Sequence, residues 1–127
     1  MSNGILVFIE HRDGVVSKTS LEAIAAAQSL GSQLQQTVSA VVLGSDPEAM
    51  AQQMAAYDLA KVVSASNSKL ASYTPDGYTD AMENVVRQLD PQLLIMSHTY
   101  LVRDFGPKLA ARFGKSLISD CVRAQVD

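Results

Sequence analysis

Five side chains that could bind a ligand or move a proton occur in two short segments of the sequence: Glu10, His11, Ser97, His98 and Thr99. Each segment directly follows an apolar run that predicts a β-strand. In an open α/β sheet, ligands bind at the carboxyl ends of the strands, where helix N-termini present free N–H groups. We therefore predict that these five residues line one crevice suited to a phosphate or carboxylate.

The histidines and Ser97 do not complete a catalytic set. His11 and His98 could converge as a general base or a metal pair, but a zinc site needs a defined third ligand. Ser97 lacks the GxSxG pattern of a nucleophile elbow. A small hydrolase that uses a histidine with Glu10 is therefore the least favoured interpretation, and we predict no catalytic residues and no metal site.

Glycine-rich phosphate loops are absent from the sequence. Neither GxGxxG nor GxxxxGK[ST] occurs, and the first predicted strand leads into Glu10-His-Arg-Asp-Gly14. A dinucleotide is therefore not expected, whereas a single nucleotide such as AMP needs fewer glycines and stays possible in the crevice.

Arg103 and Asp104 form a charged pair shortly before Pro107, where a fourth helix is predicted to begin. Asp104 suits the positive end of a helix, and Pro107 suits the first turn. Arg103 is unfavourable there and needs an anionic partner, either within the chain or outside it. We interpret Arg103 and Asp104 as candidate subunit contacts.

The elements that must position these residues are short apolar strands alternating with amphipathic helices. Near-unbroken Val, Ile and Leu runs are typical of parallel strands covered on both faces. The predicted strands are Ile5–Ile9, Val38–Leu43, Ala60–Ala65, Leu93–Met96 and Ser116–Ile118, with an alternating edge strand at Cys121–Val126.

Four helices are indicated by their caps and periodicity. The first has capping-box spacing at Thr19–Glu22 and a glycine stop at Gly31. The others are predicted to start at Asp46-Pro47, with Met50, Met54 and Tyr57 on one face; to run from Thr74-Pro75 to Asp90-Pro91; and to carry Leu109 and end at Gly114. The fold class is α/β: one Rossmann-like domain over residues 1–127, an open and mainly parallel sheet with helices on both faces.

Composition narrows the function classes. The 127 residues include 10 Lys plus Arg and 13 Asp plus Glu, a net charge of −3, with no basic run. Nucleic acid and anionic membrane surfaces are therefore not expected partners. The run Ile5–Ile9 is too short to span a bilayer, and the start lacks a signal-peptide charge pattern. The single cysteine, Cys121, forms no internal disulfide, so we expect a cytoplasmic protein.

Two segments carry a family resemblance. The segment Ser97–Gly114, which contains Arg-Asp-x-x-Pro-x-x-Ala-Ala-Arg from Arg103 to Arg112, and the opening Ile5–Gly14 resemble the amino-terminal domain of the alpha subunit of electron-transfer flavoproteins. The resemblance covers essentially the whole chain. Val102 departs from it, because many members have a small residue before the Arg-Asp pair.

The resemblance implies an adenine-nucleotide-hydrolase-like domain that shapes a heterodimer and is not itself an enzyme. In that family a second domain of the alpha subunit binds FAD, and a related beta subunit supplies AMP or, in bifurcating members, a second flavin. This sequence lacks the FAD-binding part, so we expect no cofactor on this chain alone. The implied partners are the beta subunit and the missing FAD-binding domain, with self-association possible. The alternative is a free-standing AMP- or ATP-binding module similar to universal stress proteins.

Overall fold

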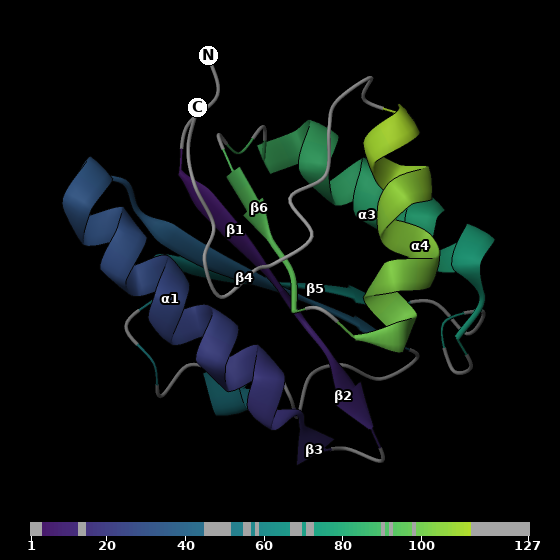
Figure 1. The fold of residues 1–127 in the computed structure, drawn as a ribbon, viewed down its shortest axis with the longest axis horizontal. Helices are drawn as coiled ribbons and strands as arrows, with labels where there is room; N and C mark the ends of the chain where they lie inside the picture. Colours follow the sequence, from purple (N-terminus) through teal and green to yellow (C-terminus); the bar gives the residue numbers. More distant parts are fainter. Residues whose placement is uncertain are drawn as a thin grey trace.

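A computed structural model describes residues 4–12, 15–44, 52–54, 57, 59–66, 70, 73–89, 91, 93–97 and 99–112 of the chain. Strands and helices alternate through these residues (Figure 1). The predicted strands Ser116–Ile118 and Cys121–Val126, the helix start at Asp46-Pro47 and the helix end at Gly114 lie outside them.

The main sheet is parallel and four-stranded, in the order β5-β4-β1-β6. Strand β1 (Ile5–Ile9) is buried along its whole length, and β4 (Val38–Gly44) is nearly so. Strands β5 (Lys61–Ser66) and β6 (Leu93–Ile95) lie on either side of this pair. The central strands are apolar along nearly their whole length because helices cover both of their faces, as predicted.

The helices form a layer on each side of the sheet. Helix α1 (Lys18–Leu34) covers one face, and α3 (Pro75–Leu89) and α4 (Tyr100–Arg112) cover the other (Figure 1). The core includes Phe8, Tyr78 and Phe105, whose rings meet edge to face at centroid distances of 5.2 to 6.3 Å. Each such ring removes a large apolar area from water, a stabilisation of about 1.5–3 kcal/mol.

Both ends of α1 differ from the prediction. The N-cap is Ser17, not Thr19, and its hydroxyl accepts a hydrogen bond from the Ser20 N–H. At the other end Gly31 remains inside the helix, and Gln35 takes the left-handed conformation with φ 57°. Gly31 is buried, and an added Cβ would lie 2.8 Å from the Gln36 carbonyl oxygen. Its role is therefore close packing rather than helix termination.

The two helices on the opposite face differ in how well their starts were predicted. Helix α3 begins as expected, since Thr74 caps it by accepting from the Gly77 N–H at 3.1 Å. Helix α4 begins at Tyr100, well before the predicted start, so Pro107 is inside the helix instead of in its first turn. Arg103 and Asp104 consequently lie on the helix, whereas the sequence placed them ahead of it.

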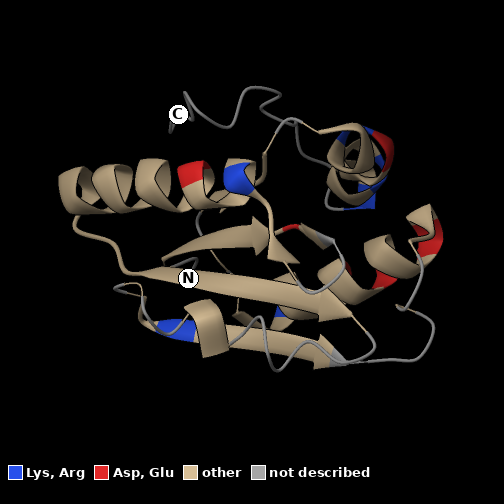
Figure 2. Ribbon diagram, turned by 90° about the horizontal axis from the view of Figure 1, so that it is seen from below, with Lys and Arg blue, Asp and Glu red and all other residues tan. Residues whose placement is uncertain are grey.

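Some segments differ in the structure from what the sequence predicted. A two-stranded antiparallel pair, β2 (His11–Arg12) and β3 (Val15–Val16), occurs where a loop was predicted after β1. Strand β5 ends at Ser66, one residue beyond the predicted strand Ala60–Ala65. Met54 is buried, whereas Tyr57, predicted on the same helix face, is 38% exposed. Figure 2 shows the charged residues mainly on the helices, with the central strands of the sheet uncharged.

Candidate functional site

The strand order reverses between β1 and β6, and the name crevice is kept below for this predicted position. The chain leaves β1 through α1 toward β4 on one side, and β6 pairs with β1 on the other. This reversal is the position at which open α/β sheets bind ligands. Glu10 directly follows β1, and Thr99 lies between the end of β6 and the start of α4.

Glu10 and Thr99 bridge this position. The Thr99 hydroxyl donates a hydrogen bond to Glu10 Oε1 at 2.8 Å, and both residues are half-buried. Thr99 is also the N-cap of α4, because its Oγ1 accepts from the Val102 N–H at 3.3 Å. An internal carboxylate thus lies beside the N-terminus of α4, where a ligand phosphate would otherwise be favoured.

The main chain of Glu10 is held by the start of α1. The Glu10 N–H donates to Ser20 Oγ at 2.7 Å, and the Glu10 carbonyl oxygen accepts from the Ser17 N–H at 2.9 Å. Ser20 is fully buried. The sequence prediction missed Ser17 and Ser20, although two serines three positions apart before an amphipathic helix are a detectable capping signal.

Ser97 and His11 are occupied by internal hydrogen bonds. Ser97 is 6% exposed, and its hydroxyl donates to the Thr19 carbonyl oxygen at 2.8 Å. His11 Nε2 lies 2.6 Å from the Leu43 carbonyl oxygen. Because a carbonyl oxygen only accepts, Nε2 is the donor in this hydrogen bond. His98 lies outside the described residues, so the convergence of the two histidines stays a prediction.

Two tyrosines near the crevice are held in the neutral form. Burial raises the pKa of the Tyr78 hydroxyl, and the negative charge of Glu10 raises it further. Burial also raises the pKa of Tyr73, with a further contribution from its hydrogen bond to Asp104. Tyr73 was not predicted as a site residue, because it lies at the end of a polar segment that is typical of a loop. Both hydroxyls therefore act only as hydrogen-bonding groups near neutral pH.

The two charges of the Arg103-Asp104 pair have different surroundings. Asp104 Oδ2 accepts a hydrogen bond from the Tyr73 hydroxyl at 2.7 Å. The Arg103 guanidinium carbon lies 5.8 Å from the centroid of the Tyr100 ring, which is a cation–π arrangement. Both residues are exposed on α4. Asp104 therefore has an internal partner, whereas the charge of Arg103 faces an aromatic ring.

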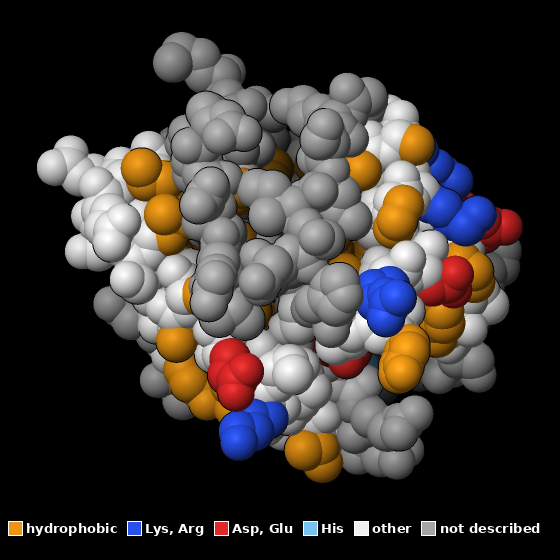
Figure 3. Space-filling view, viewed as in Figure 1, with side chains coloured by type: hydrophobic (Ala, Val, Ile, Leu, Met, Phe, Trp, Pro, Cys, Tyr) orange, Lys and Arg blue, Asp and Glu red, His pale blue; other side chains and the backbone are white. Residues whose placement is uncertain are grey.

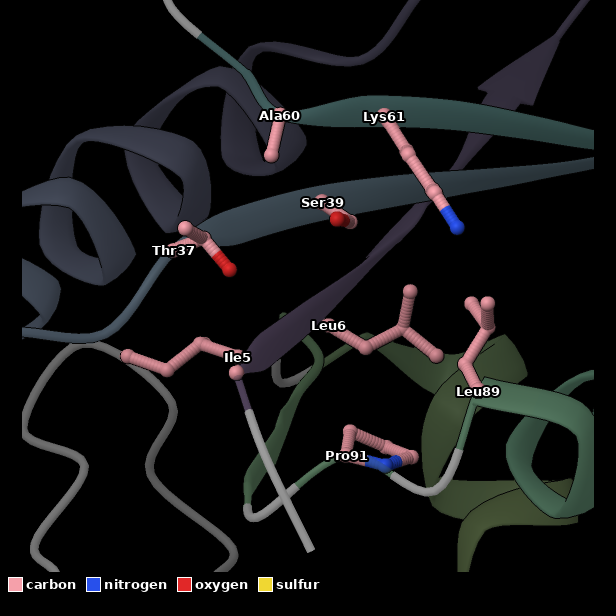
Figure 4. Close-up of a pocket in the computed structure, with 9 residues that line it drawn as sticks. Ile5, Leu6, Thr37, Ser39, Ala60, Lys61, Leu89 and Pro91 are labelled. Carbon is pink, nitrogen blue, oxygen red and sulfur yellow. The ribbon is translucent and has the colours of Figure 1, made fainter.

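A cavity of about 260 Å³ lies at the opposite end of the sheet from the crevice. It is lined by Ile5, Thr37, Ser39, Lys61 and Pro91, among others, from the starts of β1, β4 and β5 and from beyond the end of α3 (Figure 4). Lys61 extends over it and is the one charged residue among the described residues of the lining. Since this is the amino-terminal edge of the strands, the cavity is separate from the predicted site.

Of the predicted crevice residues, Glu10 and Thr99 hydrogen-bond to each other, whereas Ser97 and His11 bond to the main chain of Thr19 and Leu43. Among the described residues, no group of three or more His, Cys, Asp or Glu side chains could hold a metal ion. In the same part of the chain, no helix is long and apolar enough to cross a membrane. The hydrogen bonds at this position fix the starts of α1 and α4 relative to the sheet.

Comparison with known proteins gives a consistent match over nearly the whole sequence. Residues 5–127 match the family model described as the electron transfer flavoprotein domain. The chain is 34% identical to the electron transfer flavoprotein subunit alpha of Clostridium acetobutylicum over 98% of its own length, and 36% identical to that of Bacillus subtilis over 99%.

Another relative carries a different name. The chain is 30% identical, over 97% of its length, to the acryloyl-CoA reductase electron transfer subunit beta of Anaerotignum propionicum. The chain spans 37% and 38% of the two alpha subunits and 34% of this third protein. The matched region is therefore a little over a third of each relative.

Proposed function

Because the chain belongs to the electron transfer flavoprotein domain family, we propose that it acts as the amino-terminal domain of an alpha subunit. In this role it shapes the contact with a beta subunit, and the electron-carrying flavin is held outside this chain. The chain itself performs no catalytic step.

The observation that carries this proposal is the internal bridge across the crevice. The ligand position of the sheet is occupied by the Glu10 carboxylate, whose Oε1 accepts from Thr99 at 2.8 Å. A nucleotide phosphate placed there would meet a like charge and would have to replace an existing hydrogen bond. A structural role needs no ligand at this position, and the same bridge disfavours the alternative of a free-standing AMP- or ATP-binding module.

The contact residues of this proposal are Arg103 and Asp104. Both are exposed on α4, and Arg103 carries the stronger argument because Asp104 is already bound by Tyr73. Replacing Arg103 by alanine should weaken assembly with a beta subunit while leaving the thermal midpoint of the isolated chain unchanged. A large fall in that midpoint would instead make Arg103 an internal structural residue.

The test of the proposed function is the visible absorption spectrum of the purified chain, with mass spectrometry of any small molecule released on heat denaturation. We expect a colourless protein that releases nothing, and a stable complex when the cognate beta subunit is added. A flavin band near stoichiometry would contradict the placement of the redox site. Released AMP would favour the nucleotide-binding module.

A further inference from the structure

Tyr100 is the most exposed of the large hydrophobic residues described, with 87% of its surface accessible. The other described rings on this side of the sheet behave differently, since Phe8, Tyr73, Tyr78 and Phe105 pack against one another. Tyr100 is the first residue of α4, and its only described ring contact is with the Arg103 guanidinium. An aromatic ring left in water on a helix is typical of a contact surface.

Arg103 has no carboxylate partner among the described residues. The ion pairs in this part of the structure use Arg87 and Arg112, and the neighbouring Asp104 accepts from Tyr73. Arg103 also lies close to the positive end of α4, where a cation is unfavourable. Both facts favour a negatively charged group supplied from outside the chain.

The ring of Tyr100 prepares Arg103 for such a contact. With the guanidinium carbon 5.8 Å from the ring centroid, the planar group is held in place before binding, so less side-chain entropy is lost when a partner arrives. Tyrosine and arginine are the residue types that dominate binding energy at protein interfaces. A planar guanidinium pairs best with a carboxylate, which it can bind through two hydrogen bonds.

Tyr100 and Arg103 both lie in the first turn of α4. Figure 3 shows hydrophobic side chains beside a Lys or Arg side chain over that turn. Tyr100 and Arg103 are together named the α4 patch.

We propose that the α4 patch docks a protein surface that presents a carboxylate to Arg103 and an apolar side chain to Tyr100. This inference rests on the proposed function, under which that surface belongs to the beta subunit. A single arginine beside Asp104, on a chain of net charge −3, suits one carboxylate better than a polyanion.

The experiment adds a beta subunit to the chain and measures the dissociation constant by calorimetry. Tyr100→Ala and Arg103→Ala should each weaken assembly by about tenfold or more, the effect of a central interface residue. Arg103→Lys should recover only part of the loss, because an ammonium cannot form the paired hydrogen bonds. Lys108→Ala, which removes another exposed cation on α4, should leave the constant unchanged and serves as the matched control.

A charge reversal sharpens the test. Arg103→Glu should weaken assembly more than Arg103→Ala, and replacing the contacting beta-subunit carboxylate by lysine should restore assembly of the Arg103→Glu variant. Unchanged thermal midpoints establish that the variants fold. If the parent assembles and neither Tyr100→Ala nor Arg103→Glu weakens it, the docking inference is wrong while the proposed function stands. If the parent does not assemble with a beta subunit, the proposed function itself fails.

Discussion

Thr99 donates a hydrogen bond to Glu10 across the point where the strand order reverses, with Oγ1 and Oε1 2.8 Å apart. These residues are 89 positions apart in the sequence. The bond therefore connects the first strand of the sheet to the helix that follows β6. It also places a carboxylate at the position where related folds admit a ligand.

Thr99→Val should destabilise the chain by about 1–2 kcal/mol, the usual cost of losing an N-cap. Valine has nearly the shape of threonine but can neither accept from the Val102 N–H nor donate to Glu10. Urea unfolding followed by circular dichroism measures the difference. Thr99→Ser, which keeps the hydroxyl, is the matched control and should stay close to the parent. Equal midpoints for the valine and serine variants would exclude a capping contribution.

Ser20→Ala should cost about 1–3 kcal/mol, because it leaves the Glu10 N–H without its acceptor. Ser20 is fully buried, so water cannot easily replace the lost oxygen. The exposed Ser29 on the same helix provides the comparison, since Ser29→Ala should be neutral or slightly stabilising through helix propensity. Thermal unfolding of both variants measures the difference. An unchanged thermal midpoint for Ser20→Ala would mean that the Glu10 N–H finds another acceptor.

We expect the ion pairs of Glu83 to make a pH-dependent contribution to the free energy of unfolding. Hydrogen bonds from Arg112 and Arg87 lower the pKa of the Glu83 carboxyl, and Arg112 links α4 to α3 through Glu83 and Asp80. A carboxyl with a lowered folded-state pKa stabilises the fold above its unfolded pKa and loses that effect as the pH falls. The parent should therefore exceed Glu83→Gln in stability at neutral pH.

That difference should shrink as the pH falls through and below the ordinary glutamate pKa of about 4.3. Because Glu83 and Arg112 are partly accessible to solvent, the effect should be small and should weaken at high salt. Thermal midpoints from pH 7 downward, at low and high salt, measure both dependences. A constant difference across the pH range would contradict the linkage.

The sequence predicted the strands better than the helix ends. The run Ile5–Ile9 coincides with β1, because a strand covered on both faces must be apolar throughout. Helix α4 was placed too late, because Pro107 resembles a first-turn proline, whereas the true N-cap is Thr99, which accepts from the Val102 N–H. Likewise the partners of Ser97 and Asp104 are distant in sequence, so no local pattern could indicate them.

Gly31→Ala should destabilise the chain, although alanine favours helices over glycine by about 1 kcal/mol. An added Cβ would lie 2.8 Å from the Gln36 carbonyl oxygen and 3.0 Å from Val38 Cγ2, at the point where α1 turns back into β4. The first contact is with main chain, so it cannot be relieved by a rotamer change, and overpacking of this kind costs about 1–3 kcal/mol. Ser32→Ala, at the exposed neighbouring position, gains the propensity without the clash and should be neutral or stabilising. Denaturant midpoints of the two variants should thus move in opposite directions. If Gly31→Ala is instead more stable than the parent, the main chain after α1 can shift to accommodate the added Cβ, and Gly31 is not needed for packing.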